Sequence, residues 1–537
     1  MRNGKLNFAK YLTVALIFCC CVLAAMAGFG RTNMKLLQAE SGVYQRFAHA
    51  SKEQKAQLLR TFWTTQNHSH YIPIAFTNEF EFTRLAGMHS WPWRSRQIAA
   101  LALAATLTFL LARSAARIWQ MNGFAANSFA AGFAAILTFQ PLMNELIAWP
   151  VLFIHLIWIS LVLFTLWCLV TLANRPTEGR WVWLAAIAAY GSMHFLGLGA
   201  AVVVATGLIF CLLLFGIQRG HLREFGPIKT QLIAALIFLG VLGSAHALCM
   251  FLLPSSSPPS PLSSKAFHAS VAEAIALVTL YPLAIATSFG GVNSILPVNR
   301  QIFGDPWPFG ILIAVAAIWI GIRLGRAAFH GKTTTALTAM VLHVFATTAF
   351  FGWIMMIGLR QIYETDRLGD YGFLVGPRYL VPVSFLLCGI LLVMMMPFFR
   401  RGGTRSAIFS IMIATAAFWS HYNYDKNVYS RTPLLTGVSQ VRAWQQIVAV
   451  ARESRSAHLK IPNIPMAKLT EGFDFDLRYF EPMLRHDLQL SPGEHCEFID
   501  WNECRKEDRT SYEAAVPSLR SVIQTLGLEE ARAVANN

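Results

Sequence analysis

The sequence predicts an all-α polytopic membrane protein with about 11 transmembrane helices, a large outer loop after helix 1 and a small mixed α/β outer C-terminal domain. Hydrophobic residues make up 55% of the 537 residues and charged residues only 13%. The apolar residues fall into runs close to the roughly 20 residues that a helix needs to cross a bilayer. Basic residues gather in alternate connections between these runs, as in cytoplasmic loops.

Each expected span is an apolar run bounded by polar or glycine-containing sequence. The run 181–217 is too long for one helix, and Gly197 and Gly199 mark the expected break. The run 269–291 could cross the membrane, or lie at its surface within an outer loop. The expected spans are residues 11–29, 97–113, 124–140, 148–172, 181–196, 199–217, 232–253, 307–325, 336–358, 374–397 and 406–420.

Charge placement favours a non-crossing run at 269–291. The loops on one side then contain many basic residues and only two acids, Glu178 and Glu224. The positive-inside rule places the N-terminus in the cytoplasm and the C-terminus outside. The formal net charge of +16 is therefore mainly a topology signal. The inner basic residues are Arg2, Lys5, Lys10, Arg113, Arg117, Arg175, Arg180, Arg219, Arg223, Lys229, Arg323, Arg326, Lys332, Arg400, Arg401 and Arg405.

Two domains are expected. Residues 1–420 form the membrane domain, with outer loops at 30–96 and 254–306, and residues 421–537 form the outer, periplasmic domain. That tail has 14 Lys/Arg against 16 Asp/Glu, which excludes a nucleic-acid surface there. The first helix also has a small-residue sequence, Ala25-Met26-Ala27, that resembles a signal-peptide cleavage site. Loop 30–96 lies outside in either case.

Seven of the nine cysteines lie in apolar runs, where they behave as small hydrophobic residues. Cys496 and Cys504 lie in polar sequence of the outer tail, and no second pair with metal-ligand spacing accompanies them. An oxidising compartment favours a disulfide between them, and two free thiols are the alternative.

Three outer segments contain the residue types that catalysis at a membrane surface needs. They are the loop 30–96, the turn 140–150 and the stretch 360–379. Ionisable residues at a membrane boundary are functional candidates. The candidates are Glu40, His70, Tyr71, Glu79 and Glu81 in the loop, Glu145 and Trp149 in the turn, and Arg360, Arg378 and Tyr379 in the third segment.

Together these segments resemble the C-type glycosyltransferase (GT-C) fold, polytopic enzymes that use polyprenyl-phosphate sugars. The resemblance rests on the large loop after the first helix and a His-Tyr-x-Pro element at 70–73. A Pro-x-x-x-Glu-x-x-x-Trp turn at 141–149 and an Arg-Tyr pair at 378–379 complete it. The match covers residues 11–172, and the later spans by topology alone.

Transfer of a sugar from a lipid phosphate needs a carboxylate that accepts the proton of the acceptor, and groups that stabilise the phosphate leaving group. In the resembled family the base is an acid, usually Asp, shortly after the first span. This loop contains no Asp, so Glu40 is the best positional substitute, with Glu79, Glu81 and Glu145 as further candidates. Each is also consistent with an ordinary solvated charge, a helix or strand edge, or a turn.

The resemblance also implies substrate-binding roles. Arg378 would clamp phosphate, because a guanidinium binds two phosphate oxygens at once, and a snorkelling interfacial anchor is the alternative. His70 would orient the acceptor or bind phosphate, or else cap the loop. The predicted substrate-binding set is His70, Tyr71, Trp149, Arg360, Arg378 and Tyr379. His194 and His246 lie in apolar runs and are expected to be structural.

The resemblance therefore implies a membrane glycosyltransferase at the outer face of a bacterial inner membrane, acting on a cell-envelope glycan, lipid or protein. An O-antigen-type polymerase or ligase, a lipid-linked sugar flippase or transporter without catalysis, and an inactive relative are the alternatives. The sequence requires no cofactor, although an acid pair could bind a divalent cation. Glycines 197 and 199 lack the strand–helix context of a phosphate loop.

Overall fold

The computed structural model describes residues 2–32, 34–35, 44, 51–66, 71–87, 89–254, 278, 307–331, 334–368, 381–384 and 404–426. For residues 2–10, 251, 307–309 and 355–368 the description covers the backbone alone. These residues form helices, and no strand occurs among them.

The helices of the described residues range in length from 3 to 35 residues. In chain order they are α1 (Arg2–Phe29), α3 (Lys52–Thr64), α4 (Pro73–Ala86), α5 (Ser90–Ile118), α6 (Gly123–Thr138), α7 (Met143–Ala148), η1 (Pro150–Leu152), α8 (Phe153–Asn174), α9 (Arg180–Met193), α10 (Gly199–Gln218), η2 (Arg223–Ile228), α11 (Lys229–Leu252), α14 (Trp307–Gly331), α15 (Thr334–Leu368) and α18 (Thr404–Tyr424).

Seven helical segments of the described chain are long and apolar enough to cross a membrane, which confirms an integral membrane fold. The helices α6, α9 and α18 coincide with three further expected spans. Only residues 381–384 of the expected span 374–397 are described, so the number of 11 spans stays a prediction. The C-terminal domain and the run 269–291 lie outside the described residues, except for residue 278 and residues 421–426.

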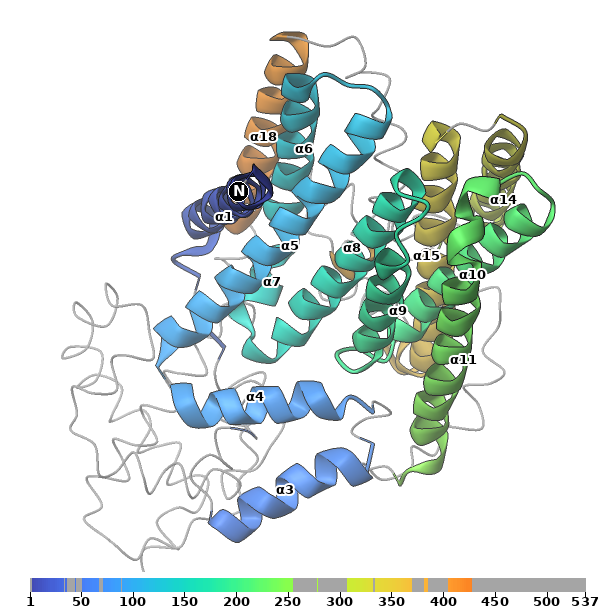
Figure 1. Ribbon diagram of the computed structural model, residues 1–537. Helices are drawn as coiled ribbons and strands as arrows, with labels where there is room; N and C mark the ends of the chain where they lie inside the picture. Colours follow the sequence, from blue (N-terminus) through green and yellow to red (C-terminus); the bar gives the residue numbers. More distant parts are fainter. Residues whose placement is uncertain are drawn as a thin grey trace, which may run out of the picture.

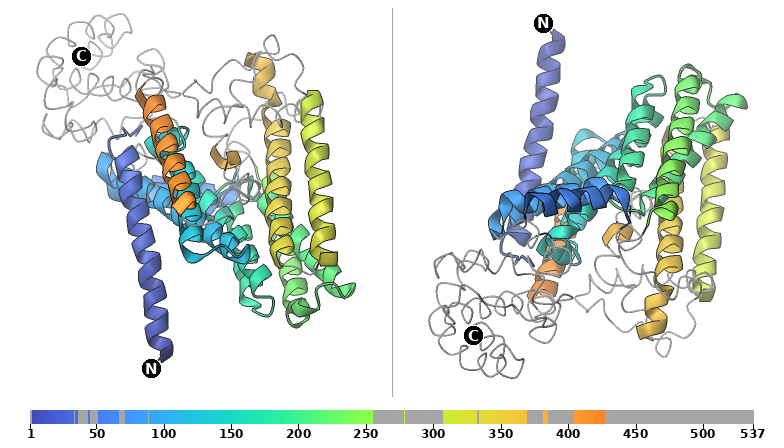
Figure 2. Two further views of the ribbon diagram at one scale, coloured as in Figure 1. Left: turned by 90° about the horizontal axis from the view of Figure 1, so that it is seen from above. Right: turned by 90° about the horizontal axis from the view of Figure 1, so that it is seen from below.

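The helices α3 and α4 lie within the described part of loop 30–96. The sequence predicts helix near 51–63, and α3 confirms it. Its start is fixed by a capping box, in which Ser51 Oγ accepts from the Gln54 amide and Gln54 Oε1 accepts from the Ser51 amide. Proline at the first position of α4 suits a helix start, because that N–H has no partner inside a helix. Both helices run crosswise to α1 and α15 (Figures 1 and 2).

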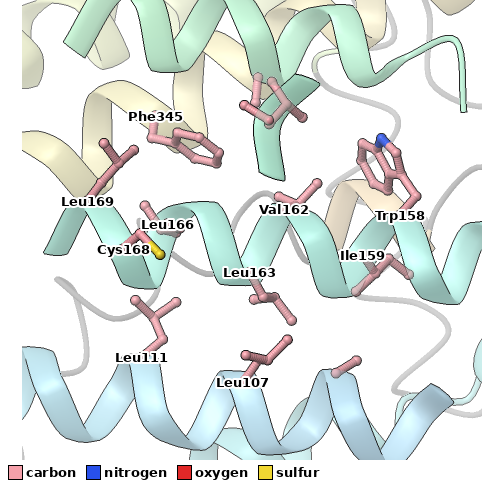
Figure 3. Packing of buried hydrophobic residues seen from close by; sticks show 14 of the residues in the cluster. Leu107, Leu111, Trp158, Ile159, Val162, Leu163, Leu166, Cys168, Leu169 and Phe345 are labelled. Carbon is pink, nitrogen blue, oxygen red and sulfur yellow. The ribbon is translucent and has the colours of Figure 1, made fainter. Parts of the chain in front are cut away.

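The core of the bundle is built around α8. On one side of α8 the Leu163 side chain lies towards Leu107 of α5, and on the other side Leu166 and Leu169 lie towards Phe345 of α15 (Figure 3). These side chains are almost fully removed from solvent. Helix α8 is therefore the element on which the α1–α5–α6–α18 group and the α9–α10–α11–α14–α15 group of helices are joined (Figure 1).

The break expected within 181–217 is confirmed between Met193 and Gly199, where α9 ends and α10 begins. A Cβ atom on Gly199 would lie 2.4 Å from the backbone nitrogen of Met193. Glycine is therefore required for the close approach of the two helix ends.

Successive spans alternate in direction, so their connections meet at two ends of the bundle. At the first, here called the loop end, the Lys35 amide donates to the Ala148 carbonyl (2.7 Å). At the opposite end, here called the basic end, the Thr335 hydroxyl lies 3.5 Å from the Ile118 carbonyl. The described inner basic residues cluster in or near the basic-end connections, as the charge pattern predicts.

Candidate functional site

The candidate site lies at the loop end, where α4 crosses the start of α5 and the turn 140–150. Helix α5 supplies two consecutive polar side chains that point into this junction, Arg96 and Gln97. They bind one residue of α4 and two backbone carbonyl groups of the turn. We call Glu79, Arg96 and Gln97, with the carbonyls of Trp149 and Pro150, the junction cluster.

The Arg96 guanidinium contacts a carboxylate, a backbone carbonyl group and three aromatic rings. Its Nη2 donates to Glu79 Oε2 at 2.7 Å and lies 3.2 Å from the Pro150 carbonyl. The guanidinium carbon lies 4.2 Å from the ring centroid of Phe82, 4.7 Å from Trp93 and 4.1 Å from Phe153. Stacking of a cation on aromatic faces in a desolvated site is favourable, and it adds to the ion pair.

Glu79 is buried, with 1% of its surface exposed. Burial raises the pKa of its carboxyl group to about 7, even though the adjacent Arg96 guanidinium lowers it. Its Oε1 atom, and Nε and Nη1 of Arg96, have no hydrogen-bond partner among the described residues. A buried carboxylate with a pKa near neutrality can exchange a proton at physiological pH.

Gln97 fixes the turn 140–150 to α5. Its Nε2 donates to the Trp149 carbonyl at 3.1 Å and to the Pro150 carbonyl at 3.0 Å. Trp149 itself is buried, with 5% exposure. The Trp149 and Pro150 carbonyls also accept from the backbone amides of Leu152 and Phe153, so Gln97 adds a side-chain link between α5 and the start of η1 and α8.

The turn also contacts the chain shortly after the third predicted segment. Ser384, five residues after Tyr379, donates to Oε1 of the buried Gln140 at 2.7 Å. Asn144, in α7, is 1% exposed, and neither polar atom of its amide has a partner among the described residues. Buried amides without partners are rare, and at a membrane surface they mark positions where a polar ligand or water is expected.

Tyr71 anchors the start of α4 to the other side of the bundle. Its ring centroid lies 5.3 Å from that of His246 in α11, and its backbone forms a hydrogen bond with the same imidazole. His194 lies 4.7 Å from His246, centroid to centroid. Burial, with smaller contributions from Cys249 and Tyr190, raises the pKa of the Tyr71 phenol. His246 is buried among rings, as its apolar surroundings in the sequence predict.

The other predicted residues are dispersed. Glu81 is at the surface and pairs with Arg84 at 2.7 Å, with both side chains more than 40% exposed. Glu145 is half-buried in the first turn of α7. Arg360 belongs to α15, in the part described by its backbone alone. The remaining predicted residues, Glu40, His70, Arg378, Tyr379, Cys496 and Cys504, lie outside the described residues.

Sequence reasoning missed Arg96 and Gln97, which organise the junction. Their signal is a charged and an amide residue at the apolar boundary of a span, with Glu-Phe-Glu-Phe at 79–82 shortly before. Such a residue pairs with a nearby acid or a carbonyl when it is buried.

No group of three or more His, Cys, Asp or Glu side chains in the described part of the chain is arranged to hold a metal ion. The disulfide between Cys496 and Cys504 stays a prediction, because both residues lie outside the described part of the chain. The divalent cation that the sequence allows but does not require is likewise untested. No protein-family model matches the chain, and neither a curated protein nor a solved structure matches it.

Proposed function

We propose that the chain is a membrane glycosyltransferase that transfers a sugar from a polyprenyl-phosphate donor to a cell-envelope glycan, lipid or protein. One observation carries the proposal. Segments in or next to the three predicted parts of the site, far apart in the sequence, meet at one end of the bundle. Glu79 of the loop reaches the turn through Arg96, and the turn reaches Ser384 through Gln140.

The loop end is the outer end in this proposal. The inner arginines lie at the basic end, so the positive-inside rule puts the N-terminus in the cytoplasm and the junction cluster at the outer face. Eleven spans, a periplasmic C-terminal domain and a bacterial inner membrane complete the assignment. The crosswise helices α3 and α4 then lie along the outer surface, where a lipid-linked donor and a water-soluble acceptor meet (Figure 1).

The geometry favours different roles for the acidic candidates. Glu79 is enclosed by Arg96 and its aromatic neighbours, so it serves as a positioning residue that holds α4 against α5. Glu40 and Glu145 are the candidates for the base that accepts the proton of the attacking acceptor hydroxyl. As the sugar–phosphate bond breaks, its electron pair stays on the oxygen of the leaving polyprenyl phosphate, which becomes more negative. Arg378 and His70 are assigned to stabilise this negative charge.

A reconstituted transfer assay tests the proposal. Purified full-length protein is supplied with a panel of radiolabelled polyprenyl-phosphate sugars and with cell-envelope extracts as acceptors. The wild type is compared with Glu40→Gln and Glu145→Gln. Glu81→Gln is the matched control, because Glu81 is an exposed surface residue of the same loop.

We expect transfer by the wild type and by Glu81→Gln, and a loss of at least 100-fold for the variant that lacks the base. Transfer retained in both Glu40→Gln and Glu145→Gln would exclude the assigned bases and keep the reaction class. Movement of labelled lipid across the vesicle membrane without transfer would replace the enzyme assignment by a flippase.

A further inference from the structure

A second feature lies at the basic end, far from the junction cluster. The last turns of α10 and α14 lie side by side there (Figure 1). The last turns of α14, and the chain from the end of α10 to the start of η2, carry four arginines and two histidines. This α10–α14 basic cluster consists of Arg219, His221, Arg223, Arg323, Arg326 and His330.

Local sequence explains why these side chains gather. On α14, Arg323, Arg326 and His330 follow i, i+3 and i+7 spacing and therefore share one helix face. Helix α10 ends in a Schellman motif, in which the His221 amide donates to the Gly216 carbonyl at 2.9 Å and Gly220 has φ of +72°. The turn places the His221 ring 5.4 Å from that of His330.

Among the described residues, the arginines of the cluster form no ion pair with an acidic side chain. All four are exposed. A second basic pair at the same end differs, because Arg175 and Arg180 both bind Glu178, at 3.1 and 2.5 Å. The carbonyl ends of two helices offset only about half a charge each and the exposed Glu224 beside Arg223 offsets one more, so a net positive charge remains at the cluster.

Aromatic rings place the cluster at the lipid boundary. The Arg219 guanidinium lies 5.4 Å from the Phe215 ring centroid, and that of Arg323 lies 5.5 Å from Trp319. Phe215 is 48% exposed and Trp319 60% exposed, on helices that are long and apolar enough to cross a membrane. Cationic groups that rise from lipid-facing rings lie at headgroup depth.

We propose that the α10–α14 basic cluster binds the phosphate headgroup of an anionic lipid. The unpaired guanidinium groups supply charge-assisted hydrogen bonds to phosphate oxygens, and the acyl chains lie along Phe215 and Trp319. Basic pockets between transmembrane helices bind anionic headgroups in this way. The site is independent of the proposed transfer reaction, because it uses none of the residues assigned to it.

The test measures lipid retained by purified full-length protein in native mass spectrometry and by titration in nanodiscs. The probes are phosphatidylglycerol, a lipid with two phosphates, zwitterionic phosphatidylcholine and free inorganic phosphate. The test variant is Arg219→Gln with Arg326→Gln, and Arg223→Gln with Arg323→Gln is a second one. The matched control, Arg175→Gln with Arg180→Gln, removes the two arginines that share Glu178.

We expect each test variant to lose at least tenfold in affinity for the anionic lipids, and the control to stay within twofold of the wild type. Phosphatidylcholine should bind no better to the wild type than to the variants. Equal loss in the control would show general attraction to anionic membranes and overturn the proposal. Competition by millimolar inorganic phosphate would overturn the lipid assignment in favour of a soluble phosphate site.

Discussion

Glu79 and Glu81 are two residues apart and have opposite environments. In a strand, residues i and i+2 share a face, whereas in a helix they point about 200° apart. The alternation Glu-Phe-Glu-Phe is consistent with either element, so the sequence ranks the two acids alike. Helix α4 separates them, and Glu79 becomes buried while Glu81 reaches solvent.

The pH dependence of stability should report the burial of Glu79. Its pKa is raised from 4.5 to about 7, so its contribution to stability is full below about pH 4.5 and is lost as the pH rises through 7. The whole effect is on the order of 3 kcal/mol. Thermal unfolding of the wild type and Glu79→Gln from pH 5 to 8 measures it. The stability advantage of the wild type should shrink with rising pH, and parallel curves would contradict the assignment.

Replacement of Arg96 should lower the free energy of unfolding far more than replacement of Arg84. Arg96→Met leaves the buried Glu79 carboxylate without its cation, and breaking a buried pair in this way typically destabilises by about 3–5 kcal/mol. Arg84→Met removes an exposed i,i+3 partner of Glu81, which is worth less than about 1 kcal/mol. Denaturation midpoints of the two variants in the same detergent give the comparison. Similar losses would mean that the junction cluster is not the stabilising contact described here.

At the level of elements, hydropathy predicts most of the helices and says little about the loops. Long apolar runs locate spans such as α5 and α8, because a helix is the only way to satisfy their backbone groups in lipid. The start of α5 at Ser90 lies seven residues before the predicted span at 97. Those residues mix serine and arginine with tryptophan and proline, and they include the Trp93 and Arg96 side chains that meet α4.

The α9–α10 turn offers a test at this scale. Gly199→Ala puts a Cβ atom 2.4 Å from the Met193 backbone nitrogen, so the two helix ends must separate. We expect the free energy of unfolding to fall by about 1–3 kcal/mol, as at other overpacked sites. Gly240→Ala in α11 is the control, since nothing lies within 4 Å of its added Cβ. Replacing that helical glycine should be neutral or stabilise by up to about 1 kcal/mol.

For the whole molecule, contacts between distant segments are what sequence reasoning could not supply. The pairs 66 with 254, 71 with 246 and 140 with 384 join residues that no local pattern relates. Composition and charge alternation predict a membrane protein and its two ends, because both follow from solvation alone. Which side chains meet at an end depends on how the helices tilt and pack.

Orientation can be measured directly. Glu53→Cys lies on the exposed start of α3 at the loop end, and Arg180→Cys lies at the basic end. A membrane-impermeant thiol reagent added to intact cells should label position 53 and leave position 180 unlabelled until the cells are broken. Wild-type protein controls for the native cysteines. The reverse pattern would invert the assigned topology and move the proposed site to the cytoplasm.

The attachment of the first loop to α11 also has a consequence for biosynthesis. Gln66 binds the carbonyls of Leu253 and Pro254 at 2.6 and 2.9 Å, and Tyr71 rests on His246. In the proposed orientation, the ribosome makes these partners well after the loop itself has crossed the membrane. The loop therefore lacks these contacts and stays accessible to proteases until α11 has been inserted. Chains arrested before residue 254 should be cleaved within 51–87, and chains arrested well beyond it should resist.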